Sequence, residues 1–445
     1  MSSSPPPPAD STSVPAPTSS SSPPPAADSA SAPAPTSSTG KTSKSELLSP
    51  PPVRSAEFIP DKAEYENEEE ELVNLGAFQF NGSSCREKSQ FLTLQKFLFS
   101  DRIKKMLGEG TYGKVALVAS ETRRLFAAKF FVKGNNEAED NDEAIGVEER
   151  VYKHLGSSVH DSVAKIIGIG YVDWAPDGCN KKIMLMPLLG ISIGDMVEQA
   201  QQMDSENRAL LKENEIIPKV SFRIKKIQEI GRNILLGLKF LLDHNVFHLD
   251  LKPDNVLFSA QSTFKVILKG GMHSIVVPRD TKVQITDMGL AKVVSDLSGN
   301  SEIYQSPMYR APEIFSGGIP NNKTDLWSFS IMLLQLYTCE DEYWPIGADH
   351  AHVQYFRNLQ HALGQQMTPE LWEEVSKIKG GKKVRGALKL YDNGQADPNT
   401  PPLMSLKRSY HADRLFDFLK YSLVVDWNVR PTVEDLLNHP FFQKK

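Results

Sequence analysis

The chain contains 445 residues with a formal net charge of −5, so it offers no electrostatic footprint for nucleic acid. Its three cysteines, Cys85, Cys179 and Cys339, are too few and too scattered for a disulfide framework or a metal knuckle. No apolar run is long enough to span a bilayer, and the N-terminus lacks the basic and apolar regions of a signal peptide. We therefore expect an intracellular protein, in the nucleus or the cytoplasm, with no membrane or nucleic-acid partner.

Residues 1–55 are dominated by Ser, Pro, Ala and Thr and predict a disordered tail. Such a composition cannot bury enough apolar surface to offset the entropy of ordering. The proline runs Pro5–Pro8 and Pro23–Pro25 favour polyproline II and could dock in the aromatic-lined groove of a partner, with a plain solvated spacer as the alternative. Residues 56–100, which include the acidic run Glu68–Glu71, predict a linker that leads into the folded part.

The first motif of the folded part is the glycine-rich segment Gly108-Glu109-Gly110-Thr111-Tyr112-Gly113-Lys114-Val115. Glycines allow the backbone to approach phosphates closely and to turn without a Cβ clash. The same spacing occurs in dinucleotide-binding folds, but there a helix follows directly. Here Leu117 and Val118 continue a strand, which favours a phosphate-binding loop between two strands.

A lysine lies inside the next predicted strand, Leu125–Phe130. Lys129 is either a charge at the strand edge or a phosphate ligand held by a carboxylate, and the glycine loop before it favours the second interpretation. The carboxylate should come from the following helix, for which the apolar spacing of residues 143–155 is typical. We prefer Glu148 as the partner of Lys129, with Glu149 as the alternative.

The segment His248-Leu249-Asp250-Leu251-Lys252-Pro253-Asp254-Asn255, after a predicted core helix at 222–242, places an acid, a cation and an amide in one loop. Phosphoryl transfer needs a carboxylate that orients the attacking hydroxyl, a cation near the migrating phosphate, and an oxygen ligand for Mg²⁺. Asp250, Lys252 and Asn255 can supply these groups. Asp287-Met288-Gly289 follows an alternating strand that includes Val283 and Ile285, so Asp287 can supply a second metal contact.

Six motifs together resemble those of eukaryotic protein kinases and occur in that family's order. They are the glycine loop, Lys129, Glu148, the loop 248–255, Asp287–Gly289 and Ala311-Pro312-Glu313. The resemblance implies an α+β bilobal protein kinase fold over residues 101–442. The β-rich N-lobe would extend to about residue 187 and the larger α-helical C-lobe would begin at about residue 188. ATP and Mg²⁺ are the implied cofactors.

Other segments resemble the CMGC group of kinases, and in particular its LAMMER/DYRK-like branch. Arg310 in Tyr309–Glu313 is typical of the CMGC group. The insert Ser259–Lys282, the hinge Pro187–Gly190 and the closing segment 415–442 resemble the LAMMER/DYRK-like branch. The segment Phe356–Gly364 keeps only the final Leu-Gly of the LAMMER signature, so the chain is a divergent relative of that branch.

The resemblance also implies roles for single residues. Asp250 would orient the substrate hydroxyl, Lys252 would lie beside it, Lys129 fixed by Glu148 would hold the α- and β-phosphates, and Asn255 and Asp287 would bind magnesium. Met186 would be the gatekeeper of the adenine pocket. The residues expected to contact ATP are Gly108, Gly110, Gly113, Val115, Ala127, Lys129, Met186, Leu188, Leu189 and Leu257.

Three departures bear on regulation. Leu249 replaces the arginine with which many kinases grip a phosphorylated activation loop, and without that cation the clamp cannot form. Activation-loop phosphorylation is therefore not expected to be the main switch. The regulatory tyrosine of related kinases falls at Ile303, with Tyr304 one position later. Met288 replaces the usual phenylalanine and is expected to pack on His248 and Tyr152.

The resulting hypothesis is a monomeric protein kinase that transfers the γ-phosphate of Mg-ATP to serine or threonine of protein substrates. Lys252 is typical of serine/threonine kinases, and Ser306 can support Asp250; tyrosine as an additional acceptor stays open. Proline-directed targets, through Arg310, and basic or Arg/Ser-rich targets are both compatible with the chain. The alternative is a weak or inactive kinase-fold scaffold, although Lys129, Asp250 and Asp287 are all present.

Two further pairs of residues are expected to be structural. Glu313 and Arg430 resemble the buried ion pair that ties the activation segment of kinases to the C-lobe. Asp325 and Trp327 open an apolar helix over residues 326–337, which we assign to the core.

Overall fold

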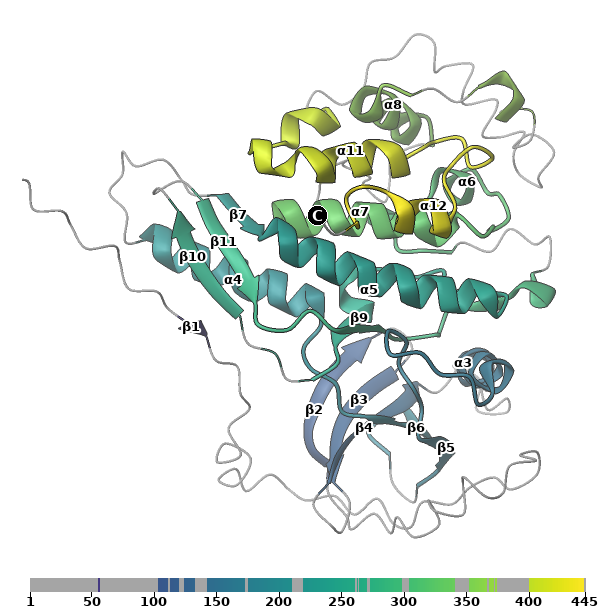
Figure 1. The fold of residues 1–445 in the computed structure, drawn as a ribbon. Coiled ribbons are helices and arrows are strands. Elements are labelled where there is room, and N and C mark those ends of the chain that lie inside the picture. The colour runs from purple at the N-terminus through teal and green to yellow at the C-terminus, as the bar shows by residue number, and fades with distance from the viewer. Residues whose placement is uncertain are drawn as a thin grey trace, which may run out of the picture. The chain divides into compact units, whose positions relative to one another are not determined.

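The computed structural model describes 55–56, 103–110, 113–119, 124–132, 142–172, 175–209, 219–260, 262, 264–269, 273–297, 304–340, 352–365, 368–371, 373 and 400–443. Nearly all of the predicted tail and linker, together with Thr111, Tyr112 and Ile303, lies outside these residues. The described part consists of a sheet-rich segment followed by a mainly helical segment, which confirms the predicted α+β kinase fold (Figure 1).

A five-stranded antiparallel sheet forms the first segment, with the spatial order β2-β3-β4-β6-β5 (Figure 1). Its strands are β2 (Ile103–Gly110), β3 (Gly113–Ala119), β4 (Leu125–Val132), β5 (Gly168–Tyr171) and β6 (Cys179–Pro187). The glycine segment is the hairpin of β2 and β3, as the strand interpretation predicted. A Cβ at Gly113 would lie 2.2 Å from the carbonyl oxygen of Phe130, so the close approach of β3 to β4 requires glycine here.

Helix α3 (Asp142–Leu155) packs on the segment that follows Asp287. Val151 and Leu155 are buried in one cluster with Met288, Ala291 and Val293. The apolar residues Val151 and Leu155, whose spacing predicted this helix, therefore face the rest of the protein. Glu148 lies on the same helix, one turn before Val151 and Tyr152.

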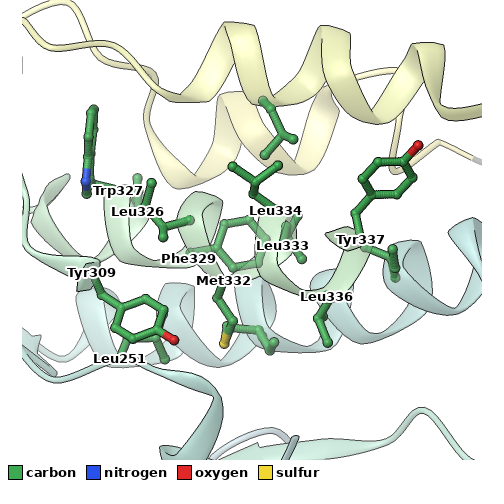
Figure 2. Packing of buried hydrophobic residues seen from close by; sticks show 14 of the residues in the cluster. Leu251, Tyr309, Leu326, Trp327, Phe329, Met332, Leu333, Leu334, Leu336 and Tyr337 are labelled. Carbon is green, nitrogen blue, oxygen red and sulfur yellow. The ribbon is translucent and has the colours of Figure 1, made fainter. Parts of the chain in front are cut away.

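The helical segment is built around α7 (Thr324–Thr338), in which every residue is buried. Figure 2 shows its apolar side chains packed between neighbouring helices, of which α5 (Ile224–Asp243) and α11 (Asp413–Ser422) contact α7. The predicted core helices at 222–242 and 326–337 are thus confirmed as α5 and α7. The other α-helices are α4 (Ile193–Ala209), α6 (Pro312–Phe315), α8 (His352–Leu363) and α12 (Val433–Asn438).

Short strands and turns hold the loops between these helices. The pair β8 (Val246–Phe247) and β13 (Lys292–Val293) and the pair β9 (Val256–Phe258) and β12 (Val283–Ile285) bracket the two motifs 248–255 and 287–289. The 3-10 turns are η2 (Pro253–Asn255), η3 (Val294–Asp296), η4 (Pro307–Tyr309), η6 (Leu403–Leu406) and η7 (Tyr410–Ala412). Both motifs therefore begin and end at a paired strand, which limits how far they can move.

The predicted insert at 259–282 forms most of a separate small sheet. Its hairpin β10 (Phe264–Lys269) and β11 (His273–Pro278) pairs with β7 (Lys219–Phe222) on one edge and with β1 (Ser55–Ala56) on the other. Within the described ranges, no helix has the length and apolarity that crossing a bilayer requires.

The predicted ion pair of Glu313 and Arg430 is confirmed. Arg430 donates from Nη1 to Oε1 and from Nη2 to Oε2 of Glu313, each at 2.8 Å, and both side chains are almost completely buried. Thr324 Oγ1 donates to Glu313 Oε1 at 3.0 Å, and Arg430 Nε donates to the carbonyl oxygen of Val424 at 2.9 Å. The pair is therefore bidentate and joins α6 to the chain before α12.

Replacing Arg430 with methionine should lower the free energy of unfolding by about 3–5 kcal/mol, because the Glu313 carboxylate would stay buried without its partner. Urea denaturation followed by circular dichroism measures this loss. As a control, Lys239→Met removes a lysine that pairs with Asp243 and Glu434 at the surface, and it should cost about 1 kcal/mol or less. Equal losses in the two variants would contradict the structural role of the buried pair.

Candidate active site

One ammonium group connects the sheet, helix α3 and the loop after β12. Lys129 Nζ, on β4, lies 2.7 Å from Oε1 of Glu148 and 2.8 Å from Oδ1 of Asp287. Lys129 and Glu148 are buried, while the Asp287 side chain is about one third exposed. Glu148 and Asp287 lie 19 and 158 positions after Lys129 in the chain. The cluster therefore exists only because α3 and β12 pack beside the sheet.

Glu148 is the partner of Lys129, as preferred from the sequence, and Glu149 is not. The Glu149 carboxylate instead binds Lys153 at 2.6 Å and Lys182, on β6, at 3.1 Å. Burial alone would raise the pKa of Glu149, but hydrogen bonds from the two lysines outweigh it and lower this pKa. Glu149 therefore fixes the side of α3 against β6, while Glu148 faces Lys129.

Burial and neighbouring charges raise the pKa values of Lys129 and Glu148 and lower the pKa of Asp287. Burial raises the pKa of Glu148 to about 8, against the attraction of the Lys129 ammonium, which lowers it. Burial would also raise the pKa of Asp287, but the charge of Lys129 and hydrogen bonds to the carboxylate hold this pKa well below its usual range. Burial would lower the pKa of Lys129, but the charges of Glu148 and Asp287 raise it. Two carboxylates thus share one ammonium, and Glu148 is the one that holds a proton more readily.

The Asp250 carboxylate is held by three neighbours that lie around the loop. Ser306 donates to Oδ1 from its hydroxyl at 2.8 Å and from its backbone N–H at 3.1 Å. Asn255 Nδ2 donates to Oδ2 at 3.0 Å and to the carbonyl oxygen of Asp250 at 2.8 Å. Lys252 Nζ lies 3.2 Å from Oδ2 and 3.3 Å from Ser306 Oγ. The structure therefore brings together the acid, the cation and the amide of this motif, together with Ser306.

Asp325, at the start of α7, binds the backbone of the loop 248–255. The N–H groups of His248 and Leu249 donate to Oδ2 and Oδ1 of Asp325 at 2.8 and 2.9 Å. Leu249 has a φ of +61°, which is uncommon for a residue with a side chain. From the sequence we had assigned Asp325 to the core helix only, and its support of the loop was missed. The available signal was a carboxylate in the first turn of a helix that is otherwise apolar.

Asn255 and Asp287 fit a magnesium ion by their chemistry. Asn255 Nδ2 donates to Asp250, which leaves the amide oxygen of Asn255 as an acceptor, and Lys129 and Gly289 both donate to Oδ1 of Asp287. Thr286 donates from its N–H and hydroxyl to the carbonyl oxygen of Asn255 at 2.8 and 3.1 Å, which joins the two loops. A hard divalent cation prefers such oxygen ligands.

The residues predicted to contact the nucleotide come from adjacent strands. Val115 is opposite Lys129 in the register of β3 and β4, and Ala127 is opposite Met186 in the register of β4 and β6. Leu257, on β9, forms a bridge with Ser192, just after the hinge. Gly108 and Gly110 lie at the end of β2, opposite Val115 and Gly113 of β3, while Leu188 and Leu189 are both half-buried after β6. The strands therefore bring these positions to the same part of the molecule as Lys129.

The departures at 288 and 304 are accommodated in the core. Met288 is fully buried in a cluster that includes the partly buried Tyr152, which supports the predicted packing on Tyr152; no contact with His248 is described. Tyr304 is 5% exposed within the largest core cluster, and Lys292 Nζ lies 5.9 Å from its ring centroid. A tyrosine in this position is closed to a modifying enzyme in the folded state.

The pKa of Glu148 predicts how the stability of the ligand-free protein depends on pH. Glu148 has a pKa of about 8 in the folded protein, raised from 4.5. Its protonation therefore contributes fully to the stability of the fold below pH 4.5, and this contribution is lost as the pH rises through 8. Glu148→Gln stays neutral, so the free energy of unfolding of the wild type should fall relative to this variant between pH 5 and 8, by up to about 1 kcal/mol per pH unit.

Urea denaturation over that range measures the difference, with Glu149→Gln as the control. Because the pKa of Glu149 is lowered, this residue is ionised in both states above pH 5, and the curve of its variant should run parallel to that of the wild type. Parallel curves for Glu148→Gln as well would contradict the assignment of the proton.

Comparison with known proteins identifies the family. Residues 102–442 match the family described as "Protein kinase domain". The chain is 25% identical to dual specificity protein kinase CLK2 of Homo sapiens (76% of this chain, 63% of that protein). It is 25% identical to serine/threonine-protein kinase AFC1 of Arabidopsis thaliana (50% of each) and to dual specificity protein kinase lkh1 of Schizosaccharomyces pombe (78% and 47%).

The chain therefore spans only about half to 63% of the length of these relatives. A crystal structure of a kinase domain matches with a TM-score of 0.61 at 21% identity, over 77% of this chain and 95% of that chain, which supports the fold. The predicted resemblance to a divergent LAMMER-like CMGC kinase is confirmed. The chain belongs to the protein kinase domain family.

Proposed function

We propose that the chain is an ATP-dependent protein kinase that transfers the γ-phosphate of Mg-ATP to serine and threonine hydroxyls of protein substrates. The observation that carries this proposal is the joint contact of Lys129 with Glu148 and Asp287 beside an intact loop around Asp250. Relatives named as serine/threonine and dual specificity protein kinases support it. Their names also leave tyrosine as an additional acceptor.

Asp250 is proposed to accept the hydrogen bond of the substrate hydroxyl and to take its proton. The N–H and O–H of Ser306 bind Oδ1 and the Asn255 amide binds Oδ2, so the carboxylate cannot rotate freely. Such restraint lowers the entropic cost of placing the acceptor. Lys252, 3.2 Å from the same carboxylate, supplies positive charge beside the attacked phosphate.

Lys129 is proposed to bind the α- and β-phosphates, with Glu148 holding its ammonium in place. Asn255 and Asp287 would hold magnesium, which neutralises charge on the phosphates. Asp287 contacts Lys129 at 2.8 Å in the ligand-free protein, so the lysine and the metal ligand are already adjacent before nucleotide binds.

The nucleotide pocket is proposed from strand positions around this cluster. The glycines of the β2–β3 hairpin would cover the phosphates, because their backbone N–H groups can approach closely. Val115 and Ala127 would lie on one face of the adenine and Leu257 on the other, with Met186 at the back and the backbone of Leu188 and Leu189 offering hydrogen bonds. The remaining pocket positions are Gly108, Gly110 and Gly113.

The inactive scaffold is the second candidate. Leu249, Met288 and the segment Gln305-Ser306-Pro307 are its only support within the described chain, and the side chains of Leu249, Met288 and Gln305 are buried. Action inside the cell, in the nucleus or the cytoplasm, stays a prediction. A groove-binding partner for the proline-rich tail stays a prediction.

Transfer of labelled γ-phosphate from Mg-ATP to a degenerate serine/threonine peptide library tests the proposal. Wild type should transfer phosphate, and Asp250→Asn should lose about 10²–10⁴-fold of the rate because the general base is removed. Asp287→Ala should lose transfer together with magnesium-dependent nucleotide binding. Tyrosine peptides in the same assay decide whether the specificity is dual.

Well-folded wild type that binds ATP without transferring phosphate to any peptide would favour the scaffold. Retained transfer in Asp250→Asn would contradict the role of this carboxylate. The alternative glutamate provides a matched control, because Glu149→Gln, unlike Glu148→Gln, leaves the partner of Lys129 intact.

A further inference from the structure

The side chain of Gln305 is buried and bonded on every polar atom, just before the serine that binds Asp250. Gln305 is 3% exposed. Its Nε2 donates to Ser328 Oγ at 2.7 Å and to the carbonyl oxygen of Thr324 at 3.3 Å, both on α7. Its Oε1 accepts from the N–H of Ala311 at 2.9 Å. One amide therefore joins both ends of the segment 304–311 to the core helix.

These partners can be satisfied only by a group that both donates and accepts. The carbonyl of Thr324 can only accept, and Ser328 uses its own hydrogen to donate to the carbonyl oxygen of Tyr309 at 2.7 Å. Both can therefore only accept a hydrogen bond from residue 305, whereas the N–H of Ala311 can only donate one. A carboxylate or an apolar side chain of similar size cannot meet both demands, and leaving buried polar groups unpaired is costly.

The backbone of Gln305 is held in a conformation that it would not adopt by itself. Its φ is +64°, in the left-handed region that residues with side chains rarely occupy. The N–H of Gln305 donates to the carbonyl oxygen of Leu249 at 2.9 Å, and its own carbonyl accepts from Arg310 Nη2 at 2.8 Å. Such strain persists only where surrounding contacts over-determine it, and the side-chain amide supplies three of those contacts.

This conformation places the next residue on the proposed base. Ser306 directs both its N–H and its hydroxyl at Oδ1 of Asp250, a geometry that depends on the peptide between residues 305 and 306. The loop of Asp250 is in turn bonded to Gln305 through Leu249. No charged or phosphorylated group is needed for this connection, in keeping with the leucine at position 249.

We propose that the Gln305 side chain is a positioning residue that holds segment 304–311 on α7, so that Ser306 keeps the Asp250 carboxylate oriented for phosphoryl transfer. This inference rests on the proposed kinase function. It assigns to a buried amide the ordering of a loop next to the site.

The test compares Gln305→Met with Gln365→Met in the full chain. Gln365 is a matched control, since its amide also bridges two backbone groups. It donates to the carbonyl oxygen of Leu423 at 2.8 Å and accepts from the N–H of Val425 at 2.9 Å, both of which lie outside the loop 248–255 and the segment 304–311. Gln305→Met should lower kcat for a serine peptide by roughly 10–100-fold, because small misplacements of reacting groups are costly. The KM for Mg-ATP should stay within about 2-fold, and Gln365→Met should keep both parameters.

Gln305→Glu separates the donor from the acceptor contacts. It keeps an acceptor for Ala311 but offers no N–H to α7, so its kcat should fall as far as that of Gln305→Met. Amide hydrogen exchange of 304–311 gives a readout without turnover, and it should be faster in both Gln305 variants and unchanged in Gln365→Met. If Gln305→Met does not fold, Ser328→Ala, which removes one acceptor, should still lower kcat by several-fold.

Folded Gln305 variants, or a folded Ser328→Ala, with the kcat and exchange rates of the wild type would overturn the inference and leave the kinase function intact. An equal fall of kcat in Gln365→Met would also overturn it, because the effect would then follow from lost stability. Absence of transfer by the wild type would instead overturn the proposed function, and the exchange data alone would then decide whether Gln305 holds the segment.

Discussion

The buried ammonium of Lys129 is the interaction on which the site depends. It is shared by Glu148, from helix α3, and Asp287, from the loop after β12. A buried ammonium is strongly disfavoured without anionic partners, so the sheet, the helix and the loop must meet at this point. The two carboxyl groups are not equivalent, because burial raises the pKa of Glu148 to about 8 while Lys129 keeps Asp287 ionised.

The second centre, around Asp250, is built mainly from hydrogen bonds. Asp325 binds two backbone N–H groups of the loop, while Ser306 and Asn255 bind the Asp250 carboxylate. Asp325 lies in the first turn of a helix in which every residue is buried, so the loop is attached to the core. The packing of the core therefore fixes the orientation of the reacting groups.

The chain has no arginine at position 249, and an apolar residue alone could not order the segment before Arg310. The structure uses two neutral groups, the buried Tyr304 ring and the Gln305 amide, together with backbone carbonyls bound by the Arg310 guanidinium. Neutral hydrogen bonds are individually weaker than charge-assisted ones, but here they are buried and mutually supporting. A divergent member of the kinase family can therefore keep the geometry around its catalytic loop with a different set of contacts.

Much of the chemistry was readable from the sequence because it is local. Asp250, Lys252 and Asn255 lie within six residues of one loop, so their proximity follows from chain connectivity, and the apolar periodicity of 222–242 predicted helix α5. The choice of Glu148 over Glu149 as the partner of Lys129, the support by Asp325 and the contacts of Gln305 needed the tertiary structure. Each of these pairs residues far apart in the chain, and their distance is set by how α3 and α7 pack, which no local pattern encodes.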